Sequence, residues 1–272
     1  MRIAITGANG QLGHALQTAL KEHQLILLDH QTLDIGSPHA TQALLALFPE
    51  VVIQAAAMTD VDGCERNPDE AYRINALGAQ HVAQACAELN AAFVYVSTDY
   101  VFDGAKHAPY DEDDAPNPLS VYGRTKLHGE EFARLTPRHY IARTSWVYAR
   151  GRKNFVNRVI QLADERPRLN MVTTEIGSPT YASDLAAAIA QLLRHPQYGV
   201  YHLVNEGAVS RYDFARAILA AIGKRDYPLD PITTFSRAAQ PPPYGALRNN
   251  RAAALGITLR PWQAALHECL ST

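Results

Sequence analysis

Short apolar runs alternate with amphipathic segments along the first half of the chain. The runs lie at 2–6, 25–28, 51–54, 93–96 and 140–143. Each is short and nearly continuous, as expected for strands buried on both faces of a parallel sheet. Between them, apolar residues recur at helical spacing over 12–20 and 68–89, and a further helix is predicted over 121–135. This order predicts an α/β fold with a doubly wound parallel sheet.

The rhythm changes after Trp146. Helices are predicted over 155–163, 184–193 and 211–222. Ser183 and Ser210 are placed to cap the second and third of these helices. A strand at 199–204 is predicted to rejoin the main sheet. The division that follows has a Rossmann-type domain over 1–149 plus 178–204, and a smaller α/β lobe over 150–177 plus 205–272.

A glycine-rich turn joins the first predicted strand to the first predicted helix. Gly7, Gly10 and Gly13 follow the spacing G-x-x-G-x-x-G. In such a turn the first glycine permits the sharp bend, the second lets a backbone amide approach a pyrophosphate, and the third lets the helix pack close to the strand. The free N–H groups of the helix N-terminus then bind phosphate oxygens. The turn therefore predicts a dinucleotide site in the first domain, with a plain turn as the alternative.

The second predicted strand ends at Asp29, about where a residue facing the adenosine ribose is expected. Its carboxylate would accept hydrogen bonds from a ribose 2′-OH and repel a 2′-phosphate, which favours NAD. No Arg or Lys stands next to it in the sequence to favour NADP. The alternative interpretation is a simple turn after the strand. Asp34 and Ile35, in the next loop, are placed to reach the adenine.

Tyr122 and Lys126 are the candidate catalytic pair. They lie four residues apart in a predicted helix and so share one face. We expect the ammonium of Lys126 to lower the phenol pKa of Tyr122 from its usual value of about 10. Such a phenol exchanges protons with carbonyl and alcohol oxygens. A hydroxyl at the end of the fourth strand, from Ser97 or Thr98, would bind the same oxygen. The alternative is a surface helix with a chance Tyr and Lys.

Composition excludes several classes of function. The 272-residue chain has a formal net charge of −2, which gives no electrostatic support to nucleic-acid or membrane-surface binding. Its three cysteines are widely spaced and fit neither a disulfide framework nor a zinc site, so we predict a reduced protein without a metal site. There is no apolar stretch of membrane-spanning length and no secretory signal pattern, and we expect a cytoplasmic protein.

Several motifs together resemble the extended short-chain dehydrogenase/reductases and, among them, the dTDP-4-dehydrorhamnose reductase family. The most specific are Val-Ser-Thr-Asp-Tyr-Val-Phe-Asp-Gly at 96–104 and Arg-Thr-Ser-Trp-Val-Tyr at 143–148. The glycine turn with Gln11, Asp34-Ile35, Tyr-Gly-Arg-Thr-Lys at 122–126 and Gly-Ser-Pro-Thr at 177–180 also match. Two segments depart from the pattern. Thr174-Glu175 stands where the family carries Asp-Gln, and residues 240–247 replace an Arg-Pro and Ser-x-Leu pattern.

The resemblance implies reduction of the C4 ketone of a thymidine-diphosphate sugar, with NADPH or NADH as the cofactor. The residues that it assigns to catalysis are Thr98, Tyr122 and Lys126. Those that it assigns to the dinucleotide are Gly7, Gly10, Gln11, Leu12, Gly13, Asp29, Asp34, Ile35, Ala57, Met58, Thr59, Tyr122 and Lys126. Those that it assigns to the sugar nucleotide, which the lobe would help to bind, are Val61, Thr98, Asp99, Tyr100 and Trp146.

Two rival functions are compatible with the same residues. One is epimerisation or dehydration of a nucleotide sugar on this scaffold, in which the acid/base group beside Thr98 would be Asp99. The other is a regulatory subunit that binds a dinucleotide and a partner enzyme without turnover. The sequence leaves open the choice between NAD and NADP, and assembly into a homodimer is compatible with it.

Overall fold

A six-stranded sheet forms the centre of the structure, a computed structural model that describes residues 1–271. Its strands are β1 (Arg2–Thr6), β2 (Gln24–Leu28), β3 (Val51–Gln54), β4 (Ala92–Thr98), β5 (His139–Thr144) and β10 (Gly199–His202). They lie in the order β10-β5-β4-β3-β1-β2, and every neighbouring pair is parallel. After β2 the chain crosses to the other side of β1. The predicted doubly wound parallel sheet is therefore confirmed.

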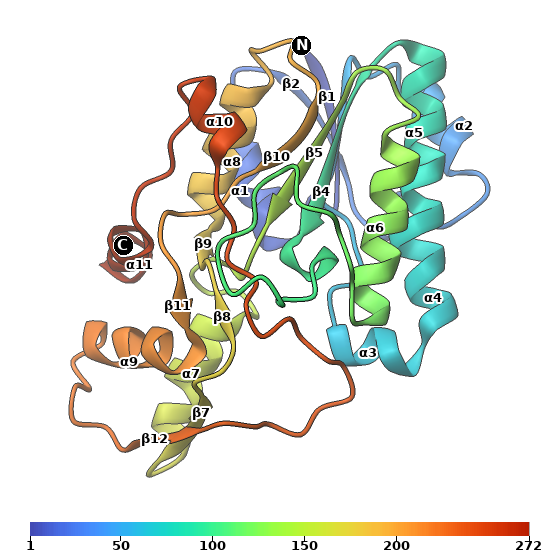
Figure 1. The fold of residues 1–272 in the computed structure, drawn as a ribbon. Helices are drawn as coiled ribbons and strands as arrows, with labels where there is room; N and C mark the ends of the chain where they lie inside the picture. The colour runs from blue at the N-terminus through green and yellow to red at the C-terminus, as the bar shows by residue number, and fades with distance from the viewer. Residues whose placement is uncertain (272) are drawn as a thin grey trace.

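Helices cover both faces of the sheet (Figure 1). One face carries α1 (Gln11–Ala19) and α8 (Ala182–Leu192), and the other carries α2 (Ala40–Leu45), α5 (Gly78–Leu89) and α6 (Val121–Ala133). Side chains alternate along β1, so Ile3 and Ile5 join the core beneath α1 and α8, whereas Ala4 joins the core beneath α2 and α5. Among residues 1–271, no helix is long and apolar enough to cross a membrane.

The helix predicted over 68–89 is divided in the structure. α4 (Pro68–Tyr72) leads into a π-helical turn, η1 (Arg73–Leu77), which leads into α5. The π turn holds Asn75, which is fully buried. Its amide nitrogen donates to the Met58 carbonyl and to the Thr125 hydroxyl at 3.1 Å each, and its amide oxygen accepts from the Met58 N–H at 2.8 Å. This extra-wide turn directs the Asn75 side chain at the loop after β3.

A smaller lobe packs below the sheet in the view of Figure 1. Its helices are α7 (Phe155–Glu165), α9 (Arg211–Ala221) and α11 (Trp262–Ser271). Its strands form three pairs: β6 (Val147–Tyr148) with β9 (Thr180–Tyr181), β8 (Ile176–Gly177) with β11 (Val209–Ser210), and β7 (Leu169–Val172) with β12 (Leu229–Ile232). Phe214, Leu219 and Trp262 are buried in a core of its own.

The two predicted helix caps have different outcomes. The Ser210 hydroxyl accepts from the Asp213 N–H at 2.9 Å and caps α9, as predicted. The Ser183 cap is wrong, because α8 begins at Ala182 directly after β9 and its N-cap, Tyr181, has no side-chain bond. The short strand leaves no room for a separate capping residue.

The chain returns from the lobe to the main sheet. β10 pairs in parallel with β5, which confirms the prediction that this strand rejoins the sheet. Farther along, α10 (Asn250–Ala254) packs on β10, and Ala252, Ile257 and Leu259 enter the core beneath α1 and α8. Residues 250–259 therefore contact the first domain, although the sequence analysis assigned 205–272 to the lobe. The division into two domains stays a prediction.

Candidate active site

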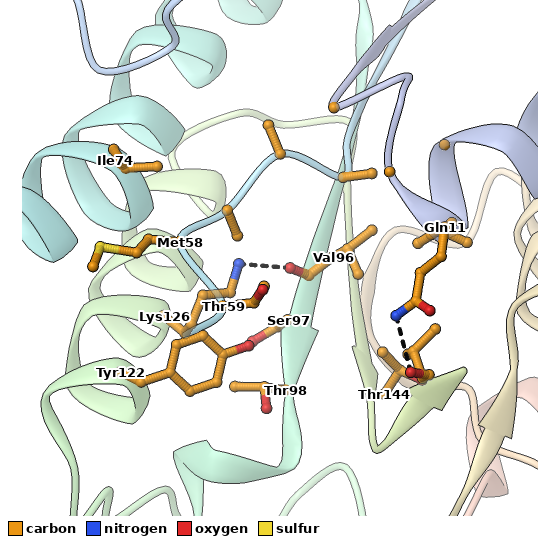
Figure 2. A pocket seen from close by; sticks show the side chains of 18 of the residues that line it. Gln11, Met58, Thr59, Ile74, Val96, Ser97, Thr98, Tyr122, Lys126 and Thr144 are labelled. Carbon is orange, nitrogen blue, oxygen red and sulfur yellow. Dashed lines mark hydrogen bonds between the residues drawn. The ribbon is translucent and has the colours of Figure 1, made fainter. Parts of the chain in front are cut away.

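A cleft with a volume of about 830 Å³ opens at the carboxyl ends of β1, β3, β4 and β5. Ligands bind at this edge of open α/β sheets. The cleft is lined by all the residues assigned to the cofactor and substrate: Gly7, Gly10, Gln11, Leu12, Gly13, Asp29, Asp34, Ile35, Ala57, Met58, Thr59, Val61, Thr98, Asp99, Tyr100, Tyr122, Lys126 and Trp146. Figure 2 shows part of this lining. The fold therefore brings the predicted residues together, and their individual roles stay predictions.

The glycine turn forms one end of the cleft. Gly7 has a φ of +70°, and a Cβ on it would lie 2.7 Å from the Ala56 nitrogen, so no other residue fits there. A Cβ on Gly13 would lie 2.3 Å from the Gly7 carbonyl oxygen. Gly10 is the N-cap of α1 and supplies no capping side chain. The first N–H groups of α1 thus face the cleft without a side-chain partner at the cap, as an anion site requires.

Asp29 lies at the rim of the cleft and forms a turn. Its carboxylate accepts from the N–H groups of Gln31 and Thr32 at 3.0 Å each and from the Asn9 side chain at 2.6 Å. The hydrogen bonds from Thr32 are the main reason that the pKa of Asp29 is lowered. The Asp29 carboxylate therefore forms the hydrogen bonds expected of a simple turn after the strand, and it also lines the cleft. The hydrogen bond from Asn9 joins the glycine turn to the end of β2, and the sequence did not predict this contact.

Tyr122 and Lys126 lie on the first turns of α6, whose N-cap is the Ser120 hydroxyl. Figure 2 shows both side chains beside Thr98 at the end of β4. Both α6 residues point into the cleft, and the Lys126 side chain is only 2 % exposed. Its Nζ donates to the Val96 carbonyl at 2.7 Å and lies 4.1 Å from the centre of the Tyr95 ring. The surface-helix alternative is wrong for this pair.

The expected effect of Lys126 on the phenol is also wrong. Burial raises the pKa of Tyr122, and a hydrogen bond with Thr98 opposes this rise only in part. Burial also lowers the pKa of Lys126 to about 7, although the Glu130 carboxylate opposes the change. The sequence shows the spacing of the pair but not how deeply it is buried, and here burial outweighs the attraction between opposite charges.

A buried ion pair lies one helical turn beyond Lys126. Glu130 and Arg143 form two hydrogen bonds of 2.8 Å, and the Ser97 hydroxyl donates to the same carboxylate at 2.7 Å. Glu130 is fully buried and Arg143 is 1 % exposed. Ser97 was one of two hydroxyls expected to bind the same oxygen as Tyr122, but it donates to Glu130. Thr98, which lies beside Tyr122, is therefore the remaining candidate at the end of this strand. This pair could not be predicted from the sequence, because its members lie on separate elements.

Asp99 is a buried carboxylate next to the catalytic candidates. It accepts from the Ser145 hydroxyl at 2.9 Å and from the Thr98 hydroxyl at 3.0 Å. Burial raises the pKa of Asp99 to about 6, and these two hydrogen bonds oppose the rise. The site therefore holds a second group that changes protonation near neutral pH. Ser145 lines the cleft as well and was missed in the sequence analysis.

Three further features form the part of the cleft assigned to the sugar. Val61 begins α3 (Val61–Arg66), where the Asp60 carboxylate accepts from the Gly63 N–H and caps the helix. Trp146 has a φ of +46° and packs on Gly177, where a Cβ would lie 2.5 Å from the indole. The guanidinium of Arg211 lies 3.4 Å from the centre of the Trp146 ring. Arg211 comes from the lobe, and nothing in its local sequence indicated that it lines the cleft.

Known proteins have this fold and are similar in sequence to this chain over nearly its whole length. The family model described as RmlD substrate binding domain matches residues 1–272. The dTDP-4-dehydrorhamnose reductase of Mycobacterium tuberculosis is 41% identical over 282 residues, which cover 99% of this chain and 92% of that protein. A crystal structure of a dTDP-4-dehydrorhamnose reductase from Clostridium acetobutylicum has a TM-score of 0.94 at 41% identity and covers 100% of this chain and 99% of its own. The Bacillus anthracis dTDP-4-dehydrorhamnose reductase, solved in complex with NADP, has a TM-score of 0.95 at 38% identity over 99% of this chain and 98% of its own.

Proposed function

Because the chain belongs to the RmlD substrate binding domain family, we propose that it is an NAD(P)H-dependent reductase that converts dTDP-4-dehydrorhamnose to dTDP-L-rhamnose. The observation that carries the proposal is the meeting of Tyr122, Lys126 and Thr98 on one wall of the cleft that the glycine turn opens. Relatives that cover nearly the whole chain are dTDP-4-dehydrorhamnose reductases, which supports the same substrate for this cleft.

The residues at the glycine turn fit a dinucleotide. The space at Gly7 that a Cβ would fill and the open N-terminus of α1 suit a pyrophosphate. Gly10, Gln11 and Leu12 would hold it, with Asp29, Asp34 and Ile35 toward the adenosine and Ala57 to Thr59 along the ribose. When bound, NADPH or NADH supplies the hydride that reduces the ketone. A related reductase was solved with NADP, so the carboxylate of Asp29 does not by itself establish a preference for NAD.

The protein's part is to place the ketone and to supply a proton. The buried phenol of Tyr122 keeps its proton at neutral pH, because its pKa is raised, and gives that proton to the C4 oxygen as a general acid. The Thr98 hydroxyl donates to Asp99 in this structure and would turn to stabilise the same oxygen when the substrate is bound. Lys126 donates one N–H to the Val96 carbonyl and has two further donors for a ribose hydroxyl when it is charged. Val61, Asp99, Tyr100 and Trp146 would hold the sugar.

The test is the oxidation of NADPH or NADH, followed at 340 nm with dTDP-4-dehydrorhamnose as substrate. A reductase consumes one reduced cofactor for each sugar converted. An epimerase or dehydratase, for which Asp99 would be the added acid, regenerates its cofactor and gives product without net oxidation. A regulatory subunit binds NADPH but oxidises none. Either of the last two results would exclude the proposed reaction.

Three further properties belong to the proposal. We place the dinucleotide in residues 1–149 plus 178–204 and much of the sugar nucleotide against the lobe. A cytoplasmic location is supported by three buried cysteines that are all free thiols. A homodimer is compatible with the sequence, and light scattering of the purified protein tests it.

A further inference from the structure

Arg211 is a partly buried cation with unused hydrogen-bond donors on the wall of the cleft. It is the first residue of α9, and its guanidinium lies over the Trp146 ring at 3.4 Å and near the Phe155 ring at 4.8 Å. Its side chain is 16% exposed. Among residues 1–271, no oxygen accepts a hydrogen bond from its guanidinium. Because an arginine has five N–H donors in a planar fork, this position suits a phosphate or carboxylate of a ligand.

A single carboxylate lies between Arg211 and a second arginine. Glu175 is 3.6 Å from Arg211 Nε through one oxygen and 3.8 Å from Arg237 Nη1 through the other. These ion pairs are longer than hydrogen bonds. Arg237 also approaches Asp62 of α3 at 3.5 Å. Glu175 therefore neutralises part of the local positive charge without satisfying the N–H groups of either guanidinium.

A nucleotide sugar would bring its diphosphate to this place. In the proposed function the C4 ketone meets Tyr122 and the sugar lies near Trp146. The diphosphate is attached to C1, across the sugar ring from C4, and needs cationic hydrogen-bond donors. Among the described residues that line the cleft, Arg211 is the arginine that can supply them. The charged oxygens of the diphosphate match the fork of a guanidinium better than a carboxylate held at 3.6 Å.

We infer that the carboxylate of Glu175 competes with the substrate's diphosphate for Arg211 and Arg237, and so lowers the affinity of the cleft for the nucleotide sugar. The inference rests on the proposed function. It explains the charge arrangement: two arginines for a strongly anionic group, and one carboxylate that keeps them paired until that group arrives. A neutral amide at this position would not compete in this way.

The experiment compares Glu175→Gln with the wild type in the full chain saturated with NADPH. The probe is thymidine diphosphate, and binding is measured by calorimetry. We expect the variant to bind thymidine diphosphate about five- to tenfold more tightly. The reason is that the substitution removes the negative charge of Glu175, which repels the diphosphate and occupies both arginines. The affinity for NADPH stays unchanged. The matched control is Glu165→Gln on α7, whose carboxylate pairs with residues of its own helix and leaves the affinity as it is.

A second variant tests whether Glu175 acts through Arg211. Arg211→Gln weakens thymidine diphosphate binding by at least tenfold, and in this background Glu175→Gln changes the affinity by less than half as much on a logarithmic scale as in the wild type. The inference is overturned if Glu175→Gln binds thymidine diphosphate as tightly as the wild type, more weakly or not detectably. It is also overturned if Glu175→Gln changes the affinity as much in the Arg211→Gln background as in the wild type. A wild-type chain that binds thymidine diphosphate but oxidises no NADPH with the keto sugar refutes the reductase instead, so the two failures are distinguishable.

Discussion

Replacement of Lys126 by methionine is expected to stabilise the fold while it abolishes turnover. The Lys126 side chain is 2 % exposed and burial lowers its pKa to about 7. An ammonium at this position is costly, because the amine loses water and gains only one backbone carbonyl and an aromatic face. Methionine has a similar length, carries no charge and tolerates irregular packing. The same substitution removes the group proposed to bind the cofactor ribose.

The structure gives the size of this effect. A fall in pKa from 10.5 to about 7 is a gap of about 3.5, which at about 1.36 kcal/mol per pKa unit disfavours the folded ammonium by about 5 kcal/mol. At pH 7, close to the folded pKa, about 4 kcal/mol of this cost is present. The lost bond to the Val96 carbonyl offsets about 1–2 kcal/mol. We therefore expect Lys126→Met to raise the free energy of unfolding by roughly 2–3 kcal/mol at pH 7.

The pH dependence separates this cause from a general packing gain. Because the folded pKa of Lys126 lies below its unfolded value of 10.5, the unfolded wild-type chain binds more protons between about pH 7 and 10.5. The stability that Lys126 contributes thus rises with pH in that window and is lowest below it. Urea unfolding of both proteins at pH 6 to 10 should show the advantage of the variant vanish as the pH rises. A constant difference, or a less stable variant at pH 7, would refute the reasoning.

Three other substitutions test separate parts of the site. Tyr122→Phe removes the proton donor and should lower kcat about 10²- to 10⁴-fold with unchanged NADPH affinity, and near-native turnover at 340 nm would end its role as general acid. Glu130→Gln leaves the buried guanidinium of Arg143 without its charged partner and should lower the free energy of unfolding, measured by urea unfolding, by about 3–5 kcal/mol. Glu131→Gln, on the exposed side of α6, is the control and should change the free energy of unfolding by less than about 0.5 kcal/mol. Gly7→Ala adds a Cβ that would lie 2.7 Å from backbone and should weaken NADPH binding by at least about tenfold in a fluorescence titration. Gly151→Ala, at a φ of +65° with nothing within 4 Å, is its control for backbone strain alone, and an equal loss in both would contradict the steric argument.

The sequence was most informative where structure depends on near neighbours. Continuous apolar runs predicted β1, β3, β4 and β5, because strands buried on both faces need apolar residues throughout. The run at β2 predicted a strand as well, but this strand lies at the sheet edge and Leu27 is exposed. The glycine turn was predicted because its backbone tolerates no Cβ at Gly7 or Gly13. The strand ends then brought all the candidate residues to one edge, since parallel strands share their carboxyl ends.

The features that the sequence missed depend on contacts between distant segments. The π turn holds Asn75 where it bonds to Met58, which lies 17 residues earlier. Arg211 enters the cleft from the lobe and meets Trp146 only in the folded chain. The pKa shift of the Tyr122 phenol was predicted with the wrong sign, because the spacing of Tyr122 and Lys126 does not report burial, and burial is the main cause of the rise.

Because β10 returns to the main sheet, neither part of the molecule can be exchanged between proteins as one continuous segment of the chain. The chain passes from the first part to the lobe, back through α8 and β10, out again through α9, and back once more at α10. A fragment that stops near residue 150 would strip the outer strand from β5 and uncover the apolar side chains beneath α8, which include Leu185 and Ile189. A chimera that takes the lobe of one relative and the main sheet of another would therefore need several junctions at matching positions. A chimera with a single junction would expose a sheet edge that is prone to aggregation.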